Sequence, residues 1–274
     1  MKQSQFLELL RLTKISLSEY INWGEEEVFK MPFAAIAAKR ADILKPETDI
    51  AAENCLAAKN IPPKELRQKE NPAENLNQEK QLEDLKNKLN SCRECPLGAG
   101  RLNCVFGEGN PNADLMFIGE GPGFDEDHSG LPFIGKAGQL LTKIIEAMGF
   151  SRAEVYIANI VKCHPMKEPS QPESRGNDRP PSELEIETCK KYLDMQIDIV
   201  KPKAIAALGA SALKGLFPKE EKTISQARGA WLKYRGVALM PTYHPAALLR
   251  NPELKKPVWQ DMKAVIKFLQ GIAK

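Results

Sequence analysis

The sequence predicts an α/β fold, a three-layer α/β/α arrangement around a central parallel sheet of four strands. Four short apolar segments, residues 115–118, 155–161, 204–208 and 237–240, have the length and composition of buried strands. Glycine or proline turns follow them, and helical periodicity follows the turns. Strands that alternate with helices pair in parallel, because each crossover carries the chain back across one face of the sheet.

The first third of the chain is predicted to lie outside this sheet. Apolar residues at helical spacing from Phe6 to Trp23 predict one amphipathic helix. Residues 61–81 are rich in Pro, Asn, Gln, Glu and Lys, which is typical of a mobile linker. We therefore divide the chain into an N-terminal extension, residues 1–85, and an α/β domain, residues 86–274. The extension is expected to be a tether whose helix is a candidate for binding a protein partner.

Composition narrows the class of protein. No apolar run is long enough to span a membrane, and the N-terminus lacks the pattern of a secretory signal. We therefore expect a cytoplasmic protein with no membrane partner. We also expect a monomer. The net charge of +3 is unevenly spread: residues 1–86 hold 13 Lys and Arg against 15 Asp and Glu, so the surplus lies in residues 87–274. Such a surplus is compatible with a surface that faces nucleic acid.

Four cysteines form a candidate ligand set. Cys92 and Cys95 make a Cys-x-x-Cys pair at the end of a helical pattern, and Cys163 follows the second predicted strand. Cys189 lies in a helix that begins with the capping box Ser182-Glu-Leu-Glu185. In a reducing compartment, cysteines favour metal or cluster binding over disulfides. Four thiolates suit structural Zn²⁺ or a [4Fe–4S] cluster, and the spacing alone does not choose between them.

Two further cysteines are expected to be free thiols. Cys104 is a rival ligand, but it precedes Val105-Phe106, which is predicted to be a strand, so a buried thiol is the simpler interpretation. Cys55 stands alone in the N-terminal extension.

A glycine-rich loop connects the first strand to the next helix. Its glycines at positions 119, 121 and 123 allow the backbone to approach a ligand closely. In open parallel sheets, ligands bind beyond the carboxyl ends of the strands, where this loop would lie. The loop lacks both the Gly-Lys-Ser/Thr ending of a P-loop and the Gly-x-Gly-x-x-Gly spacing, so a mononucleotide site is not expected.

Polar side chains follow the predicted strands at the same edge of the sheet. Glu120 comes after the first strand, Asn159 ends the second and His244 follows the fourth. Each of these residues alone is more often structural than catalytic. A carboxylate, an amide and an imidazole that share one crevice, with Phe133 nearby, instead indicate a functional site.

Residues 88–270 resemble the family 4 uracil-DNA glycosylases, the iron–sulfur type of bacteria and archaea. The motifs that carry the resemblance are Cys92-x-x-Cys95-Pro-Leu, Val105-Phe-Gly-Glu-Gly, Gly119-Glu-Gly-Pro-Gly with Glu126-Asp127, Pro132-Phe-Ile-Gly-Lys-Ala-Gly138, Asn159-Ile-Val-Lys-Cys163 and Pro-Thr-Tyr-His244-Pro-Ala. The resemblance implies the uracil-DNA glycosylase fold and a monofunctional DNA-repair hydrolase that flips uracil out of single- or double-stranded DNA and leaves an abasic site. It also implies a [4Fe–4S] cluster on Cys92, Cys95, Cys163 and Cys189, and a nucleoid-associated protein.

The same resemblance assigns roles to the candidate residues. Phe133 would stack on the uracil, Asn159 would pair with its O4 and N3–H, and His244 would donate to its O2. Glu120 is the favoured carboxylate for positioning water or base. Gly121 stands where the best-known uracil glycosylase family has an aspartate. Two other carboxylates are weaker candidates, Glu126 and Asp127.

Contacts to DNA are expected from the same edge. The candidate cations are Lys162, Arg179, Arg228 and Arg250, and Leu248 or Leu249 is the candidate wedge for the gap that a flipped base leaves.

Two alternative functions remain open at this point. One is a covalently trapping relative that reacts through a histidine near His164, although the basic insertion of such proteins is absent. The other is a non-catalytic iron–sulfur protein that binds uracil-DNA.

Overall fold

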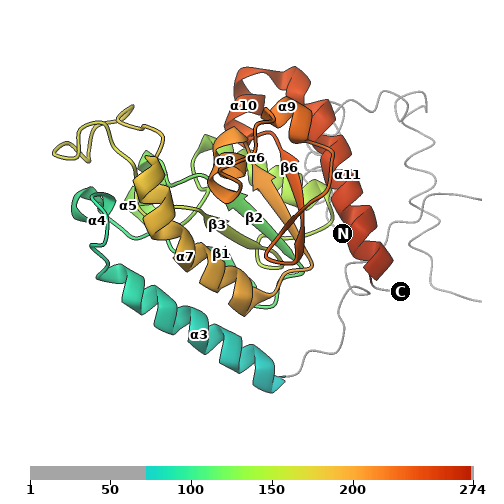
Figure 1. Cartoon of the computed structure of the whole chain (residues 1–274), viewed down its shortest axis with the longest axis horizontal. Helices are drawn as coiled ribbons and strands as arrows, with labels where there is room; N and C mark the ends of the chain where they lie inside the picture. The colour runs from blue at the N-terminus through green and yellow to red at the C-terminus, as the bar shows by residue number, and fades with distance from the viewer. Residues whose placement is uncertain (1–71, 273–274) are drawn as a thin grey trace, which may run out of the picture. The chain divides into compact units, whose positions relative to one another are not determined.

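A six-stranded mixed sheet forms the centre of residues 72–272, the part of the chain that the computed structural model describes (Figure 1). The strand order is β1-β3-β2-β4-β6-β5. The strands are β1 (Glu108–Gly109), β2 (Leu115–Gly119), β3 (Tyr156–Asn159), β4 (Ala204–Leu208), β5 (Leu232–Tyr234) and β6 (Val237–Thr242). The four central strands pair in parallel, as the sequence predicts.

Two antiparallel edge strands, β1 and β5, are additions to the predicted sheet. β1 spans only two residues, which is too short for any periodicity, and the strand predicted at Val105-Phe106 is wrong. β5 joins β6 through Arg235-Gly236, both with positive φ (48° and 86°), which is the conformation of a tight hairpin turn.

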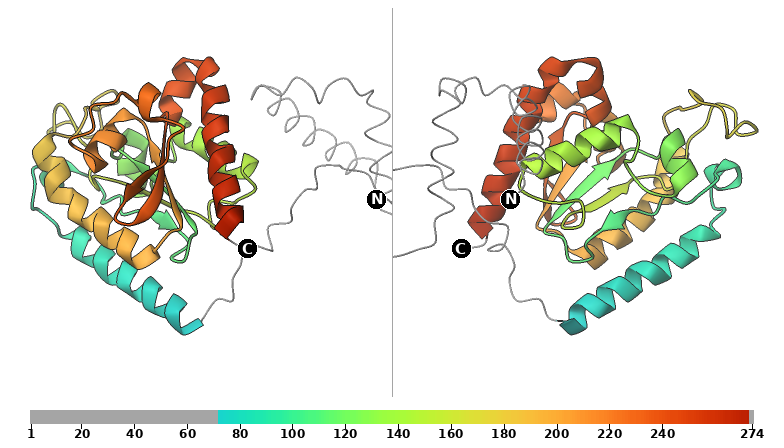
Figure 2. Two further views of the ribbon diagram at one scale, coloured as in Figure 1. Left: turned by 45° about the vertical axis from the view of Figure 1, so that its right-hand side comes forward. Right: turned by 180° about the vertical axis from the view of Figure 1, so that it is seen from behind.

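Helices cover both faces of the sheet (Figures 1 and 2). Their bounds are α3 (Pro72–Asn90), α4 (Leu97–Gly100), α5 (Phe124–Ser129), α6 (Lys136–Ala147), α7 (Glu183–Val200), α8 (Ala210–Leu216), α9 (Ile224–Ala227), α10 (Pro245–Arg250), the 3₁₀ helix η3 (Pro252–Leu254) and α11 (Lys255–Ile272). One face carries α7 and α8, and the opposite face carries α6, α10 and α11. Because side chains alternate along a strand, every residue of β2 is buried against one layer or the other. None of these helices is long and apolar enough to cross a bilayer.

Helix α3 corrects the linker prediction. Residues 72–81 are helical despite their polar composition, and α3 packs against α7. Leu82, Leu85 and Leu89 are at most 8% exposed in the core, which shows why a helix with one narrow apolar stripe is stable here. The division predicted at residue 85 falls inside this helix. The predicted N-terminal helix, Cys55 and the rest of the predicted linker lie outside the described residues.

Candidate active site

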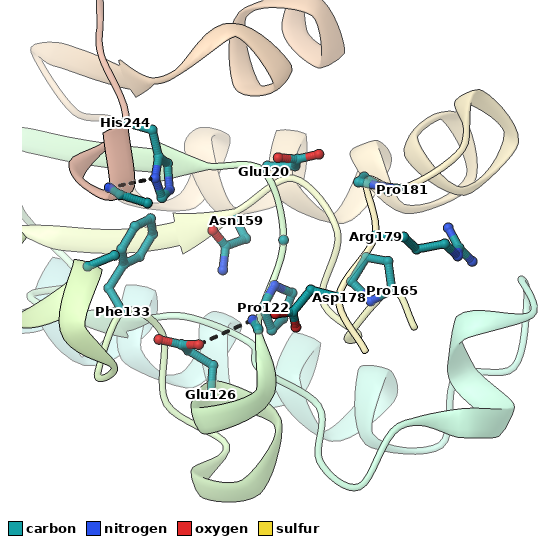
Figure 3. Close-up of a pocket in the computed structure, with 14 residues that line it drawn as sticks. Glu120, Pro122, Glu126, Phe133, Asn159, Pro165, Asp178, Arg179, Pro181 and His244 are labelled. Carbon is teal, nitrogen blue, oxygen red and sulfur yellow. Dashed lines mark hydrogen bonds between the residues drawn. The ribbon is translucent and has the colours of Figure 1, made fainter. Parts of the chain in front are cut away.

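A cavity of about 290 Å³ opens at the edge of the sheet where the parallel strands end. Glu120 and Gly121 reach it from the loop after β2, Asn159 from the end of β3, and His244 from the turn after β6. Phe133 enters from the segment before α6. The sequence-predicted residues are thus brought together in one cavity, and Phe133, Asn159 and His244 face one another in Figure 3.

The backbone of Gly119 forms the surface against which two of these side chains lie. Gly119 and Asn159 are paired in the parallel register of β2 and β3. A Cβ at position 119 would lie 2.3 Å from Asn159 Oδ1 and 2.5 Å from Phe133 Cζ, so only glycine allows both side chains to approach. Asn159 Oδ1 is buried and has no hydrogen-bond partner. Buried polar atoms are nearly always paired, so this oxygen indicates a missing ligand.

Phe133 is held in an unfavourable backbone conformation. Its φ is 52°, a left-handed value that is rare for an aromatic residue. Arg152 Nη1 donates to the Phe133 carbonyl oxygen (3.1 Å), and Arg152 Nη2 donates to the Pro132 carbonyl oxygen (2.8 Å). Glu108 in β1 binds the same guanidinium, so the short edge strand helps to fix the aromatic ring. Glu108 belongs to the motif Val105-Phe-Gly-Glu-Gly, but its role could not be read from the sequence, because Arg152 and the Phe133 segment lie far from it along the chain.

His244 is the N-cap of α10. Its Nδ1 accepts a hydrogen bond from Ala246 N (3.1 Å), which leaves the ring proton on Nε2. Burial, with a smaller contribution from the positive charge of Arg250, lowers the pKa of His244 to about 4. The imidazole is therefore neutral at physiological pH and presents an Nε2–H donor. Its ring centroid lies 5.7 Å from that of Phe133.

The candidate carboxylates differ in how they are used. Glu120 Oε1 is buried without a partner, and burial raises the pKa of Glu120 while a hydrogen bond with Ser211 opposes the rise. Glu126 also lines the cavity, but its oxygens accept from the backbone N–H groups of Ile134 (3.0 Å), Gly135 (3.1 Å) and Gly123 (3.2 Å). Glu126 thus fixes the loop around Phe133, and Glu120 retains an oxygen for chemistry.

Asp127 does not line the cavity. It is fully buried and accepts hydrogen bonds from the backbone N–H groups of Leu102 and Asn103. Asp178 was not predicted, yet it lines the cavity and its Oδ1 lies 2.6 Å from His164 Nε2. The side chain of His164 is 1% exposed between these two aspartates and does not line the cavity, so it does not face a bound base.

A second cavity is lined by Cys92, Cys95, Cys163 and Cys189, and Cys104 does not line it. These thiols come from the segment after α3, the segment after β3 and the middle of α7. Burial raises the pKa of Cys163 to about 12 and that of Cys189 to about 11, so these thiols need a bound cation to be ionised.

The surroundings of these thiols fit an extended negatively charged group. Arg101 Nη1 donates to Cys163 Sγ at 3.0 Å, and the hydroxyl of Tyr192 lies 3.8 Å from Cys92 Sγ. Within residues 72–272, no three side chains of His, Cys, Asp or Glu are close enough to hold a single metal ion. The structure therefore shows the four thiols lining one cavity, without three of them placed around a single ion.

The predicted DNA contacts separate into free and occupied residues. Leu249 is 50% exposed on α10, the helix whose residue Ala246 lines the cavity, whereas Leu248 is 1% exposed and belongs to the core. Arg250 is exposed at the end of the same helix. Arg228 is held by Asp261 (2.7 Å), and Lys162 is completely buried. The prediction that Lys162 contacts DNA is therefore wrong.

Arg179 lines the cavity and is paired with Glu185 at the start of α7 (2.7 Å). Its guanidinium is already occupied, so its first role is to attach the loop after β3 to α7.

Comparison with known proteins gives consistent matches. The model of the uracil DNA glycosylase superfamily matches residues 106–263, more than half of the chain. A protein named type-4 uracil-DNA glycosylase from Sulfurisphaera tokodaii is 44% identical over 192 residues, 67% of this chain and 83% of the relative. The protein of the same name from Thermotoga maritima is 39% identical over 197 residues, 70% of this chain and 96% of the relative. A type-5 uracil-DNA glycosylase of Pyrobaculum aerophilum is 28% identical over 159 residues, 52% of this chain and 66% of the relative.

Proposed function

The chain belongs to the uracil-DNA glycosylase superfamily, with type-4 enzymes among its relatives, and we propose that it removes uracil from DNA by hydrolysing the N-glycosidic bond. The observation that carries the proposal is the cavity in which an aromatic ring, an unpaired amide oxygen and a neutral imidazole meet. An enzyme that acts on a base must take it out of the stack into such a pocket.

The amide of Asn159 selects the base. It offers one acceptor and two donors on a single plane, and its Oδ1 has no partner within the protein. Uracil presents an acceptor at O4 next to a donor at N3–H, so it can satisfy both ends of the amide. Cytosine presents the reverse order and would leave Oδ1 facing another acceptor. Phe133 would cover the face of the bound ring.

His244 stabilises the leaving group. As the C1′–N1 bond breaks, its electron pair goes to the uracil ring and negative charge develops on O2. The neutral imidazole carries its proton on Nε2 and can donate a hydrogen bond to that oxygen as the charge develops. One such donor aimed at a developing anion contributes about 3–4 kcal/mol.

We assign Glu120 two roles, activation of the attacking water and stabilisation of the positively charged sugar. Its unpartnered Oε1 can accept a proton from the water that attacks C1′, and its negative charge favours the cationic sugar in the transition state. Water then supplies the new hydroxyl of the abasic sugar, and the proton ends on the departing uracil or in solvent.

The four cysteines Cys92, Cys95, Cys163 and Cys189 would hold a [4Fe–4S] cluster. Support comes from their shared cavity and from the adjacent guanidinium of Arg101, which donates to Cys163 Sγ. When bound, the cluster would supply a cross-link between the end of α3, the segment after β3 and α7. Hydrolysis of this bond requires no electron transfer.

The location, the oligomeric state and the partners are proposals as well. We propose that the protein acts in the cytoplasm, on the nucleoid, as a monomer on single- or double-stranded DNA. Leu249, exposed on α10, is the proposed wedge, and the N-terminal extension is proposed to bind a protein partner.

The test is release of free uracil from a labelled oligonucleotide under single-turnover conditions. Wild-type protein should release it, and H244A and N159A should be about 10²–10³-fold slower while DNA binding is retained. Binding without release by the wild-type protein would favour the non-catalytic alternative. A heat-stable protein–DNA band on a denaturing gel would favour the covalently trapping one.

A further inference from the structure

Asp178 brings a third carboxylate to the cavity that would hold the base. It lines the same cavity as Asn159 and Phe133, and its side chain is 58% exposed. Asn159 and Phe133 are 2% and 6% exposed, so they form the floor of the cavity and Asp178 belongs to its mouth. The carboxylate lies against the glycine-rich loop, with Oδ1 3.7 Å from the position of a Cβ on Gly123 (Figure 3). A base that reaches the floor leaves its sugar at this mouth.

The backbone around Asp178 is fixed. Asp178 forms an antiparallel bridge with Met166, and the N–H of Arg179 donates to the Pro165 carbonyl oxygen (3.0 Å). The amide of the buried Asn177 donates to two carbonyl oxygens of the same loop (2.8 and 3.0 Å). The side chain of Asp178 therefore projects from a defined position, as an electrostatic contribution to catalysis requires.

His164 holds the carboxylate from behind. Oδ1 of Asp178 lies 2.6 Å from Nε2 of His164, whose side chain is 1% exposed. On the other side of the imidazole, Nδ1 lies 3.6 Å from Oδ2 of the fully buried Asp127. One oxygen of Asp178 is thus fixed against the protein, and the exposed part of the side chain faces the mouth of the cavity.

Acidic residues dominate the lining of the cavity. It contains three carboxylates, Glu120, Glu126 and Asp178, and one arginine, Arg179. The guanidinium of Arg179 is occupied by both carboxylate oxygens of Glu185 (2.7 and 2.8 Å). Negative charge at the mouth repels the phosphates of DNA and attracts a positively charged sugar. Such a charge favours the transition state over the bound substrate, which is the requirement for catalysis.

We propose that Asp178 is a second catalytic carboxylate, which lies against the deoxyribose of the flipped nucleotide and stabilises the positive charge that develops there as the C1′–N1 bond breaks. The inference rests on the proposed function. Glu120 accepts the proton of the attacking water, whereas Asp178 acts by its charge and takes up no proton. DNA that covers the mouth excludes water from the carboxylate, and its interaction with the sugar is thereby strengthened.

The test compares D178N with E173Q. Asparagine keeps the shape of Asp178 and can still accept a hydrogen bond from His164, but it has no charge. Glu173 belongs to the same loop, its side chain is 75% exposed and it is not among the residues that line the cavity, so E173Q removes an equal charge outside the site. The readouts are the saturated single-turnover rate of uracil release, the protein concentration that gives half of this rate, and Tm.

D178N should release uracil about 10-fold more slowly than wild type at saturation, an effect of the size expected from one charge near a desolvated reaction centre. Its half-saturating concentration should be unchanged or lower, because a charge that repels phosphates has been removed. E173Q should keep the saturated rate within twofold of wild type. D178E, which restores the charge, should recover part of the rate, and D178S replaces D178N in the comparison if D178N does not fold.

A wild-type rate in D178N would overturn the proposal, and so would equal losses of rate in D178N and E173Q. A D178N protein with a raised half-saturating concentration and a lowered Tm would overturn it as well, because Asp178 would then only support the loop. If the wild-type protein releases no uracil, the proposed function fails and this inference fails with it. An active wild type with an unchanged D178N rejects the inference alone.

Discussion

Replacing Gly119 by alanine tests the geometry of the base-reading site. The added Cβ would lie 2.3 Å from Asn159 Oδ1 and 2.5 Å from Phe133 Cζ, and ordinary contacts begin at 3.4 Å. Asn159 and Phe133 must therefore each retreat by about 1 Å, or the strand end must shift by a similar amount. Both side chains would then leave the positions in which they meet the flipped base.

The expected result of G119A is a single-turnover rate of uracil release about 100-fold below that of wild type, the usual effect of a 1 Å misplacement in an active site. Overpacking of this kind costs about 1–3 kcal/mol of folding free energy. For a domain of this size, each kcal/mol lowers Tm by about 2–4 °C. Release would be followed with enzyme in excess over a labelled oligonucleotide, and Tm by circular dichroism.

The matched control is G271A. Gly271 lies in α11, and a Cβ there would meet nothing within 4 Å. The control should keep wild-type rate and Tm. If G119A releases uracil within threefold of wild type at an unchanged Tm, then Asn159 and Phe133 do not lie against Gly119 during the reaction, and the account of base recognition fails.

Four further predictions follow from the same structure. E126Q should lower Tm, because Glu126 accepts three backbone N–H groups. E120Q should not lower Tm at pH 7, because burial raises the pKa of Glu120 and its ionised form destabilises the folded state, but it should lower the rate of uracil release. A thermal scan and a rate assay on both variants check this. A lower Tm for E120Q with an unchanged rate, together with a slower E126Q, would show that the two roles are exchanged. The pKa of His244 is lowered to about 4, so between pH 6.5 and 4 the unfolded state binds more protons than the folded state, and the folded state loses stability as pH falls. The Tm of wild type should therefore fall toward that of H244Q between pH 7 and 5. A difference in Tm between the two proteins that stays constant with pH would refute the lowered pKa. Deleting residues 1–71 should leave uracil release intact. Deleting residues 1–85 removes most of α3, so it should lower Tm and the visible absorbance of the cluster. Equal behaviour of the two truncations would show that α3 is dispensable.

The four parallel strands were predictable because their apolar segments are bounded by turns, and their order in the chain alternates with helices. The position of Asn159 and His244 at the strand ends then followed from topology alone. β1 could not be predicted, since two residues hold no pattern and the strand exists only through its pairing with β3. For β5, Arg235-Gly236 was the available signal.

Helix α3 shows a different limit. Its exposed face is so polar that the composition of residues 72–81 predicts a linker. The stripe of Leu82, Leu85 and Leu89 is buried only because α3 packs against α7, a contact that the local sequence does not reveal. Lys162 shows the same limit for function. Its charge suggested DNA contact, and only the fold reveals that it is buried beside the cysteines.

Uracil removal can be measured directly by an alkali-cleavage assay with anaerobically prepared protein on an oligonucleotide that contains one uracil. Thymine and cytosine oligonucleotides of the same sequence are the controls. Strand breakage is expected at the uracil alone, with H244A about 10²–10³-fold slower. Intact uracil DNA after incubation with protein that carries its cluster, or equal breakage at cytosine, would contradict it.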